Sequence, residues 1–110
     1  MTKLPDDDNK RPIPALRLKQ DGAHSISATS SSTSNANAFD QNTKVVSVYA
    51  TVDVYLNFGD SGISADANDH FYPAGIYYDF SIGEEDARHK YLAVLRAGST
   101  DGTVYISEKE

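Results

Sequence analysis

Hydrophobic and polar residues alternate strictly along residues 44–58, in the central part of the chain. Every even position from 46 to 58 is apolar, and every odd position from 47 to 57 is polar or amphipathic. Successive side chains of a β-strand point to opposite faces, so this period of two predicts strand structure with one buried face. An ordinary strand has only about five or six residues. We therefore expect a break between Ala50 and Asp53, either a tight turn between two strands or a bulge in one.

Shorter segments on either side of this stretch have similar patterns. Near the N-terminus, residues 15–19 alternate, Asp21-Gly22 is a strong turn signal, and residues 23–28 are expected to form the returning strand. Residues 76–82 alternate again, after a Pro-Ala-Gly sequence that favours a turn. The sequence thus predicts strands on both sides of the central stretch.

The C-terminal part predicts two more strands. Residues 91–97 are apolar on both faces, which places this strand in the centre of a sheet. Asp101-Gly102 is the clearest hairpin signal in the chain and is expected to join that strand to residues 103–107. The charged residues 83–88 before these strands favour a connection with at most a single helical turn.

No segment shows a 3.6-residue period over the length of a helix, so the sequence predicts an all-β protein. We expect one small antiparallel β-sandwich, of jelly-roll or immunoglobulin-like type, formed by residues 21–110. Its core is expected to contain the apolar faces of the strands: Val46, Val48, Val54, Leu56, Phe58, Ile76, Phe80, Val94 and Ile106.

Two segments differ from this sandwich in composition. Residues 1–20 are expected to form an extended N-terminal arm, because they contain three prolines, an acidic triplet and few apolar groups. Residues 29–42 are rich in Ser, Asn and Thr, whose side chains bond to local backbone, and predict a long loop. Phe39 is the large apolar residue of that loop and is expected to pin it to the body. The loop is interpreted either as flexible or as a contact for a partner.

The charge of the chain is uneven. Its formal net charge is −6, but residues 1–20 carry +2 and residues 21–110 carry −8. An acidic body repels phosphates, so we expect no nucleic-acid partner. No apolar run approaches the length of a membrane span, so we expect no membrane partner either. The chain has no Cys, which excludes disulfides and thiolate metal sites.

Residues capable of chemistry are scattered rather than grouped in motifs. None of His24, His70 and His89 has a helical partner, a zinc-site spacing or a nucleophile motif beside it. The oxygen ligands nearest to a calcium-type pattern are in one loop, at Asp60, Asp66 and Asp69, but the glycine and closing Glu of an EF-hand are missing. We therefore expect no catalytic residue, no cofactor and no bound metal.

Interface residues are expected among the exposed apolar and amphipathic side chains. The arm offers Leu4, Ile13, Leu16 and Leu18, and the long loop offers Phe39. Tyr49, Tyr55 and Tyr77, together with Tyr105, are expected on a polar-side sheet face. Tyr combines apolar area with a polar tip, which suits contact with a protein neighbour, although ordinary cross-strand tyrosine pairs would give the same pattern.

Four segments of the chain resemble a known group of proteins. Residues 45–51 read Val-Val-Ser-Val-Tyr-Ala-Thr, and residues 54–59 read Val-Tyr-Leu-Asn-Phe-Gly. Residues 71–75 read Phe-Tyr-Pro-Ala-Gly, and residues 102–108 read Gly-Thr-Val-Tyr-Ile-Ser-Glu. In their order and approximate spacing, these segments resemble small virion proteins encoded among the head and neck genes of tailed phages and gene-transfer agents. The resemblance covers residues 44–108 and leaves residues 1–43 uncovered.

The resemblance implies a non-enzymatic structural component of a phage-like virion. Such a protein decorates the head or joins the head-to-tail neck, and it is made in the host cytoplasm before it enters the virion. Its partners would be capsid, portal, neck or fibre proteins and further copies of itself in a symmetric homo-oligomer. The alternative is a carbohydrate- or receptor-binding β-sandwich module, since exposed aromatic residues can also bind sugars. The absence of Trp weakens this alternative.

Overall fold

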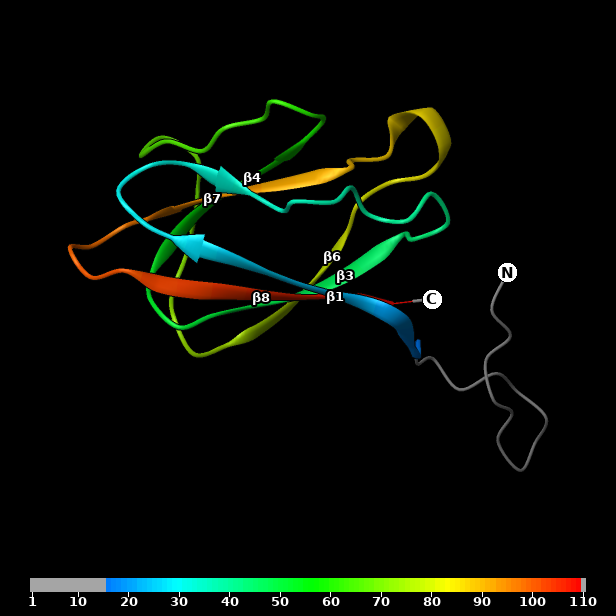
Figure 1. Cartoon of the computed structure of the whole chain (residues 1–110), viewed down its shortest axis with the longest axis horizontal. Helices are drawn as coiled ribbons and strands as arrows, with labels where there is room; N and C mark the ends of the chain where they lie inside the picture. The colour runs from blue at the N-terminus through cyan, green and yellow to red at the C-terminus, as the bar shows by residue number, and fades with distance from the viewer. Residues whose placement is uncertain (1–15, 110) are drawn as a thin grey trace.

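The computed structural model describes residues 16–109, and its strands form two layers (Figure 1). The first sheet contains, in spatial order, β1 (Leu18–Ala28), β8 (Gly102–Lys109), β3 (Val45–Ala50) and β6 (Tyr77–Ser81). The second sheet contains, in spatial order, β2 (Thr33–Ser34), β7 (Tyr91–Arg96), β4 (Val54–Gly59) and β5 (His70–Tyr72). A single 3₁₀ turn, η1 (Glu85–Ala87), precedes β7. The predicted antiparallel β-sandwich is therefore confirmed.

The strand pairing identifies the type of sandwich. β1 pairs with β8, β2 with β7, β3 with β6, and β4 with β5, all antiparallel. Two further pairings, β3 with β8 and β4 with β7, complete the sheets. This is a long double strand wound around a common core, the arrangement of an eight-stranded jelly roll. Of the two expected types, the jelly roll is the one found.

The alternating central stretch divides into β3 and β4, as predicted, but these strands belong to opposite sheets. Residues 51–53 carry the chain from one layer to the other, so they form neither a hairpin turn nor a bulge. The expected hairpin at Asp101-Gly102 is wrong for the same reason. β7 lies in the second sheet and β8 in the first, and the turn signal is used to cross between the layers. β7 has a neighbour on each side, which confirms its predicted central place.

The prediction of an N-terminal hairpin with its turn at Asp21-Gly22 is also wrong. β1 is continuous from Leu18 to Ala28, and its register against β8 shifts between Leu18 and Ala23. Asp21 lies in the left-handed region with a φ of 60°, a conformation that Asp tolerates better than most residues. Both flanking segments pair with the same strand, so the Asp-Gly signal forms a bulge and not a chain reversal.

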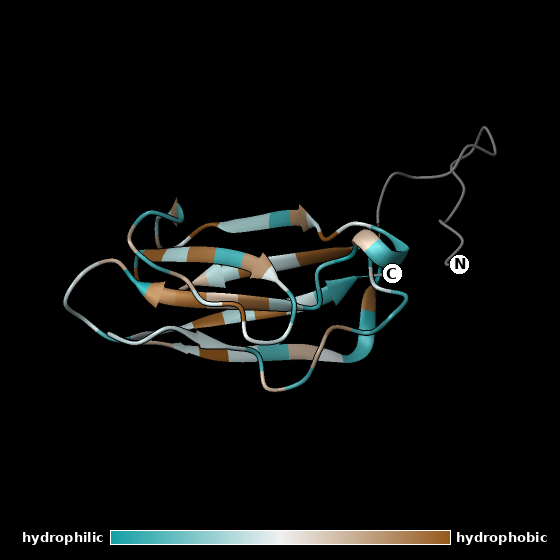
Figure 2. Cartoon of the chain, turned by 90° about the horizontal axis from the view of Figure 1, so that it is seen from above, coloured by the Kyte–Doolittle hydropathy of each residue, from teal (hydrophilic) through white to brown (hydrophobic). Residues whose placement is uncertain are grey.

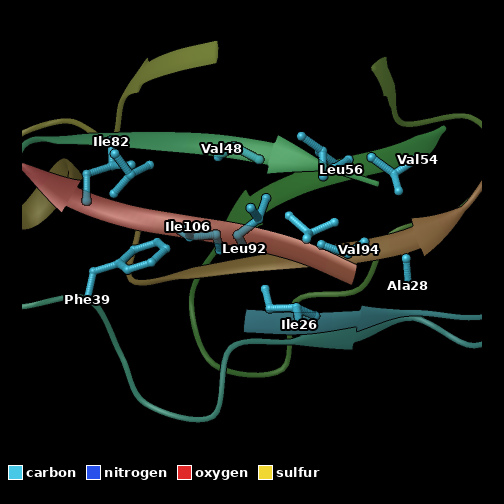
Figure 3. Close-up of a cluster of buried hydrophobic side chains, with 13 residues drawn as sticks. Ile26, Ala28, Phe39, Val48, Val54, Leu56, Ile82, Leu92, Val94 and Ile106 are labelled. Carbon is cyan, nitrogen blue, oxygen red and sulfur yellow. The ribbon is translucent and has the colours of Figure 1, made fainter. Parts of the chain in front are cut away.

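The core lies between the sheets, with side chains from both layers pointing into it (Figure 3). Most of the predicted core residues are almost fully buried: Val46, Val48, Val54, Leu56, Val94 and Ile106. Phe58 and Phe80 are partly buried and pack against this cluster. The prediction for Ile76 is wrong, because 50% of its surface is exposed. Ile76 precedes β6, in the turn that contains Gly75, where alternation no longer determines which face is buried.

Hydrophobic and hydrophilic residues alternate along the strands in Figure 2. The long loop of residues 29–42 is less irregular than expected, because it contains β2, which pairs with β7. Phe39 is 2% exposed and attaches this loop to the core, as predicted.

No helix in the described part of the chain has the length and apolar character needed to cross a membrane.

Candidate functional site

Three tyrosines form a row across the outer face of the first sheet. In the register of this sheet, Tyr49 on β3 lies directly opposite Tyr105 on β8 and Tyr77 on β6. Their neighbours along each strand, such as Val48 and Ile106, point into the core. Because side chains alternate between faces, all three tyrosines point outward. We call Tyr49, Tyr77 and Tyr105 the tyrosine row.

The tyrosine row is open to solvent. Tyr77 is 71% exposed and Tyr105 is 51% exposed, whereas Tyr49 between them is half-buried. The ring centroids of Tyr49 and Tyr77 are 4.7 Å apart, with a tilt of 38° between the ring planes. Adjacent outward tyrosines expose apolar ring area together with polar hydroxyl groups. Surfaces of this composition are enriched in protein–protein interfaces.

A polar row lies next to the tyrosine row on the same face. Ser47 on β3 is opposite Asp79 on β6, and the Ser47 hydroxyl donates a hydrogen bond to Asp79 Oδ1. Lys109 Nζ also donates to Asp79 Oδ1, over 3.1 Å. The hydrogen bond from Ser47, followed by that from Lys109, lowers the pKa of Asp79 below its ordinary value. An anionic carboxylate therefore lies beside the aromatic surface at neutral pH.

Tyr55, which we expected to share a face with Tyr49 and Tyr77, lies on the opposite side of the molecule. It is on β4 in the second sheet, where its ring contacts Phe71 at a centroid distance of 5.8 Å. The reason is the crossing at residues 51–53, which places β3 and β4 in different layers. Tyr55 and the tyrosine row cannot form one contact surface.

The outer face of the second sheet is partly covered by the loop between β4 and β5. Asn57 Nδ2 donates to the Ser64 carbonyl oxygen over 3.0 Å, and the Ala65 amide donates to Ser32 Oγ over 2.8 Å. These bonds hold the loop over the sheet, and the outward-facing Ala93 is fully buried. The first sheet thus offers the more open face.

The expected interface residues of the arm are only partly within the described residues. Leu16 and Leu18 are 44% and 67% exposed, and Leu18 pairs with Lys109 at the start of β1. The alternation of β8 gives Lys109 the same outward direction as Tyr105, so Leu18 lies on the tyrosine-bearing face. Leu4 and Ile13 lie outside the described residues.

Phe39 does not fit its expected place at an interface. Its side chain is buried, and its amide donates to the Lys90 carbonyl oxygen over 3.0 Å. The His24 ring meets its edge at a centroid distance of 5.3 Å. Phe39 is therefore part of the core and is not accessible to a partner.

Sequence reasoning missed a buried polar cluster beside Phe39. Glu108 is 4% exposed, and its carboxylate accepts hydrogen bonds from the Asp40 amide (2.7 Å) and the Thr43 hydroxyl (2.6 Å). His24 Nε2 is 2.7 Å from the other carboxylate oxygen. The signal was present in the alternation of β8, because Val104, Ile106 and Glu108 share the inward face. The chain ends in the charged sequence Glu108-Lys109-Glu110, which favours solvent exposure, so Glu108 was not expected in the core.

This cluster joins the end of β8 to β1 and to the long loop. Each carboxylate oxygen has a donor, and no buried side-chain polar atom among the described residues lacks a hydrogen-bond partner. A fully satisfied buried cluster of this kind specifies packing. We interpret it as structural.

The remaining titratable residues do not converge on a site. His70 is exposed on β5, and His89 stacks on Phe58, so the three histidines lie in different parts of the sandwich. Asp66 and Asp69 form a local turn, in which Asp69 Oδ2 accepts from the Asp66 amide over 2.7 Å. Within residues 16–109, no three His, Asp or Glu side chains are close enough together to hold a metal ion.

No protein-family model matches this chain, and no similar curated protein or solved structure was found.

Proposed function

We propose that this chain is a non-enzymatic structural subunit of a phage-like virion, which decorates the head or joins the head-to-tail neck. The observation that carries this proposal is the tyrosine row on the outer face of the first sheet. The Tyr77 side chain packs against Tyr49 but is still 71% exposed, and a neighbouring subunit would bury this remaining apolar area. Buried apolar area contributes about 25 cal/mol per Å².

Two further features support the proposal. The jelly roll is a fold that viral capsid proteins use, although lectins also use it, so the fold by itself does not decide between them. The order of the segments at residues 45–51, 54–59, 71–75 and 102–108 resembles that of small head and neck proteins. Other virion proteins and further copies of this chain are the proposed partners.

The test is co-purification with particles. Cells that produce the particles would express a tagged copy of the chain, and particles would be separated on a density gradient. We expect the tagged chain in the particle band, together with capsid and portal proteins. Labelled electron micrographs would then show whether it lies on the head or at the neck. Recovery only at the top of the gradient, with the soluble proteins, would refute the proposal.

A matched pair of variants links this test to the tyrosine row. Tyr105→Ala and Phe71→Ala each remove an aromatic ring that is about half exposed, 51% and 52% respectively, from different sheets. We expect Tyr105→Ala to reduce incorporation by about tenfold, because tyrosines are enriched among dominant interface residues. Phe71→Ala should enter the particles normally. Equal effects of the two variants would exclude the tyrosine row as the contact surface.

Carbohydrate binding is the competing function, because the exposed Tyr77 ring could also stack on a sugar. A glycan array with the full chain separates the two proposals. Binding of a defined glycan that Tyr77→Ala abolishes, without any incorporation into particles, would favour the carbohydrate-binding module.

A further inference from the structure

We propose that the open edge of β6 pairs with β6 of a second copy of this chain, so that the first sheets of the two copies join into one continuous sheet. This inference goes beyond the proposed function and does not depend on the virion assignment. The reasons are the free backbone groups of β6, the lack of protection along this edge, and the side chains that the pairing would cover.

The position of β6 in the first sheet leaves one of its sides open. Within residues 16–109, β6 is the last strand of its sheet and pairs only with β3 (Figure 1). The Ile82 amide donates to the Lys44 carbonyl oxygen over 2.8 Å, one position beyond the pair of Val45 and Ser81. This bond shows at which positions the two strands exchange hydrogen bonds.

The alternation of these bonds identifies the free backbone groups. Opposite residues of an antiparallel pair alternate between exchanging two N–H···O bonds and exchanging none. Counting back from residue 82, Tyr78 and Phe80 exchange bonds with β3. The N–H and C=O groups of Tyr77, Asp79 and Ser81 therefore point to the open edge, where a further strand can pair with them.

The other edge strands have features that discourage pairing with another chain. β1 contains the bulge in which Asp21 is left-handed. β2 has only two residues, and β5 has three and is followed by Pro73. Bulges, very short strands and prolines are means by which proteins protect sheet edges. β6 has no Pro or Lys, and its register with β3 is regular at all five of its residues.

Asp79 is the charged residue of β6, but its carboxylate is held over its own sheet. The Ser47 hydroxyl and Lys109 Nζ both donate to Asp79 Oδ1. These partners belong to β3 and β8, which lie on the side of β6 away from the open edge. The negative charge is thus compensated by Lys109 and drawn away from the edge at which the second copy would pair.

The charge of Asp79 also limits the register of the pairing. When two identical strands pair antiparallel about a two-fold axis, one residue lies opposite its own copy. A pair centred on Asp79 would place two carboxylates opposite each other, which is unfavourable. A pair centred on Tyr78 instead places Tyr77 opposite Asp79 of the second copy. These two positions carry free N–H and C=O groups, so they can exchange hydrogen bonds in this register.

The register centred on Tyr78 also covers apolar side chains. Ile76 directly precedes β6 and is 50% exposed, and it would lie opposite the half-buried Phe80 of the second copy. A pair centred on Phe80 would place Tyr78 opposite Ile82, which is already fully buried, and would leave Ile76 uncovered. Aromatic rings opposite apolar side chains stabilise strand pairs. We therefore assign the register centred on Tyr78.

The dimer would present the tyrosine rows of both copies on one surface. A two-fold axis perpendicular to the joined sheet leaves the outer faces of both first sheets on the same side. A neighbouring subunit would then meet two tyrosine rows in place of one.

Cysteine variants test the register, because the natural chain has no Cys. Full-length Tyr77→Cys and Asp79→Cys copies are mixed, oxidised mildly and analysed by mass spectrometry. We expect the disulfide between positions 77 and 79 to exceed both homodimeric disulfides, because opposite residues at hydrogen-bonded positions have Cα atoms about 5.5 Å apart, within disulfide range. The control Ser27→Cys, on the β1 edge, should remain unlinked. A dominant disulfide between two copies of position 79 would overturn the register, and no linkage, or linkage only of Ser27→Cys, would overturn the pairing.

Two substitutions at one position separate backbone pairing from side-chain contact. Asp79→Pro removes an N–H group that faces the open edge but no hydrogen bond to β3, whereas Asp79→Ala retains that group. In sedimentation velocity, we expect Asp79→Ala to be dimeric like the wild type and Asp79→Pro to be monomeric. Circular dichroism confirms that each variant is folded. A monomeric wild type, or a folded Asp79→Pro that still dimerises, would overturn the inference.

This inference and the proposed function fail in different ways. A chain that enters particles but is monomeric in solution and gives no disulfide between positions 77 and 79 refutes the pairing and leaves the proposed function intact. A chain that forms the dimer but never enters particles refutes only the virion assignment.

Discussion

Glu108 is a charged residue in a charged stretch of sequence, yet it is buried and stabilises the packing of the fold. It lies between Ser107 and Lys109 near the end of the chain, yet its carboxylate is buried and accepts hydrogen bonds from the long loop. A buried carboxylate is tolerated only where donors compensate the loss of water. The donors come from Asp40 and Thr43, with His24 beside them, so the residue connects three separate parts of the chain.

Replacement of Glu108 by Ala should therefore be strongly destabilising. It removes the acceptor and leaves the Asp40 amide and the Thr43 hydroxyl without a partner, at a cost of about 3 kcal/mol in the free energy of unfolding. Glu84→Ala is the matched control, because Glu84 pairs with Lys44 on the surface, where both side chains are more than half exposed, and should cost less than about 1 kcal/mol. Urea denaturation measures both. Similar values for the two variants would contradict the structural role of the cluster.

Asp53 and Val54 are adjacent in the sequence, but substitutions at the two positions should have very different effects on stability. Val54 is fully buried, so Val54→Asp places an unpaired carboxylate in the core and should prevent folding. Asp53 is exposed, and its Oδ1 accepts from the Ala74 amide over 2.8 Å. Asp53→Asn retains an acceptor oxygen and should be mild. Thermal melts followed by circular dichroism test both, and a cooperative Val54→Asp melt near that of the wild type would mean that Val54 is not in the core.

At the scale of elements, the connections at one end of the sandwich hold the two sheets in register. The Thr51 amide donates to the Thr103 carbonyl oxygen over 3.0 Å, and the Thr103 amide donates to Thr51 Oγ1 over 2.9 Å. The Ala97 amide donates to the Asp53 carbonyl oxygen over 2.9 Å. The β3–β4 and β7–β8 connections lie at the same end of the sandwich and are bonded to each other.

Gly102 is required by this close approach. A Cβ atom at position 102 would lie 2.6 Å from Val52 Cγ2 and 2.7 Å from Thr51 Oγ1. Both neighbours are β-branched and stiff, and Thr51 Oγ1 is held by its bond to Thr103. Gly102→Ala should cost about 1–3 kcal/mol of stability.

Gly98→Ala in the same connection is the control for Gly102→Ala. No atom outside its chain neighbours lies within 4 Å of a Cβ at position 98, so this change should be close to neutral. Denaturant midpoints of the two variants give the comparison. Equal stability of the two variants would show that the connections are not closely packed.

At the scale of the whole molecule, the sandwich has one open outer face and one that is partly covered. The tyrosine row, Leu18 and Asp79 share the open face, whereas the β4–β5 loop packs over the other sheet. Among residues 16–109, the core cluster consists of residues from Ile26 to Ile106. We therefore expect the body to fold without residues 1–14.

Deletion of residues 1–14 tests this separation of fold and assembly. The truncated chain should stay soluble and melt cooperatively near the wild-type temperature, because every residue of the core cluster remains. It should lose incorporation into particles, since we expect the prolines and apolar residues of the arm to contact a neighbouring subunit. Incorporation at wild-type occupancy would show that residues 1–14 are dispensable and would leave the tyrosine row or the long loop as the docking surface.

The sequence by itself determined the class of fold and most of the strands. Period-two alternation is a local property, because each side chain of a strand takes its direction from its own backbone. It therefore predicted β3, β4 and β6, whereas β7 was predicted from its continuous apolar run and β8 from the turn signal before it. Six of the predicted core residues are almost fully buried. The alternation also predicted that Tyr49 and Tyr77 would point away from the core.

Only the tertiary structure decided which sheet each strand joins. That choice depends on pairing between residues far apart in the chain, and alternation is the same whichever sheet accepts the strand. For this reason the turn predicted at Asp21-Gly22 is a bulge within β1, and the hairpin predicted at Asp101-Gly102 is a crossing between the sheets. Tyr55 lies on the other sheet from the tyrosine row for the same reason. The burial of Glu108 was decided in the same way, because its donors come from the long loop and β1, and only the packed jelly roll brings them to β8.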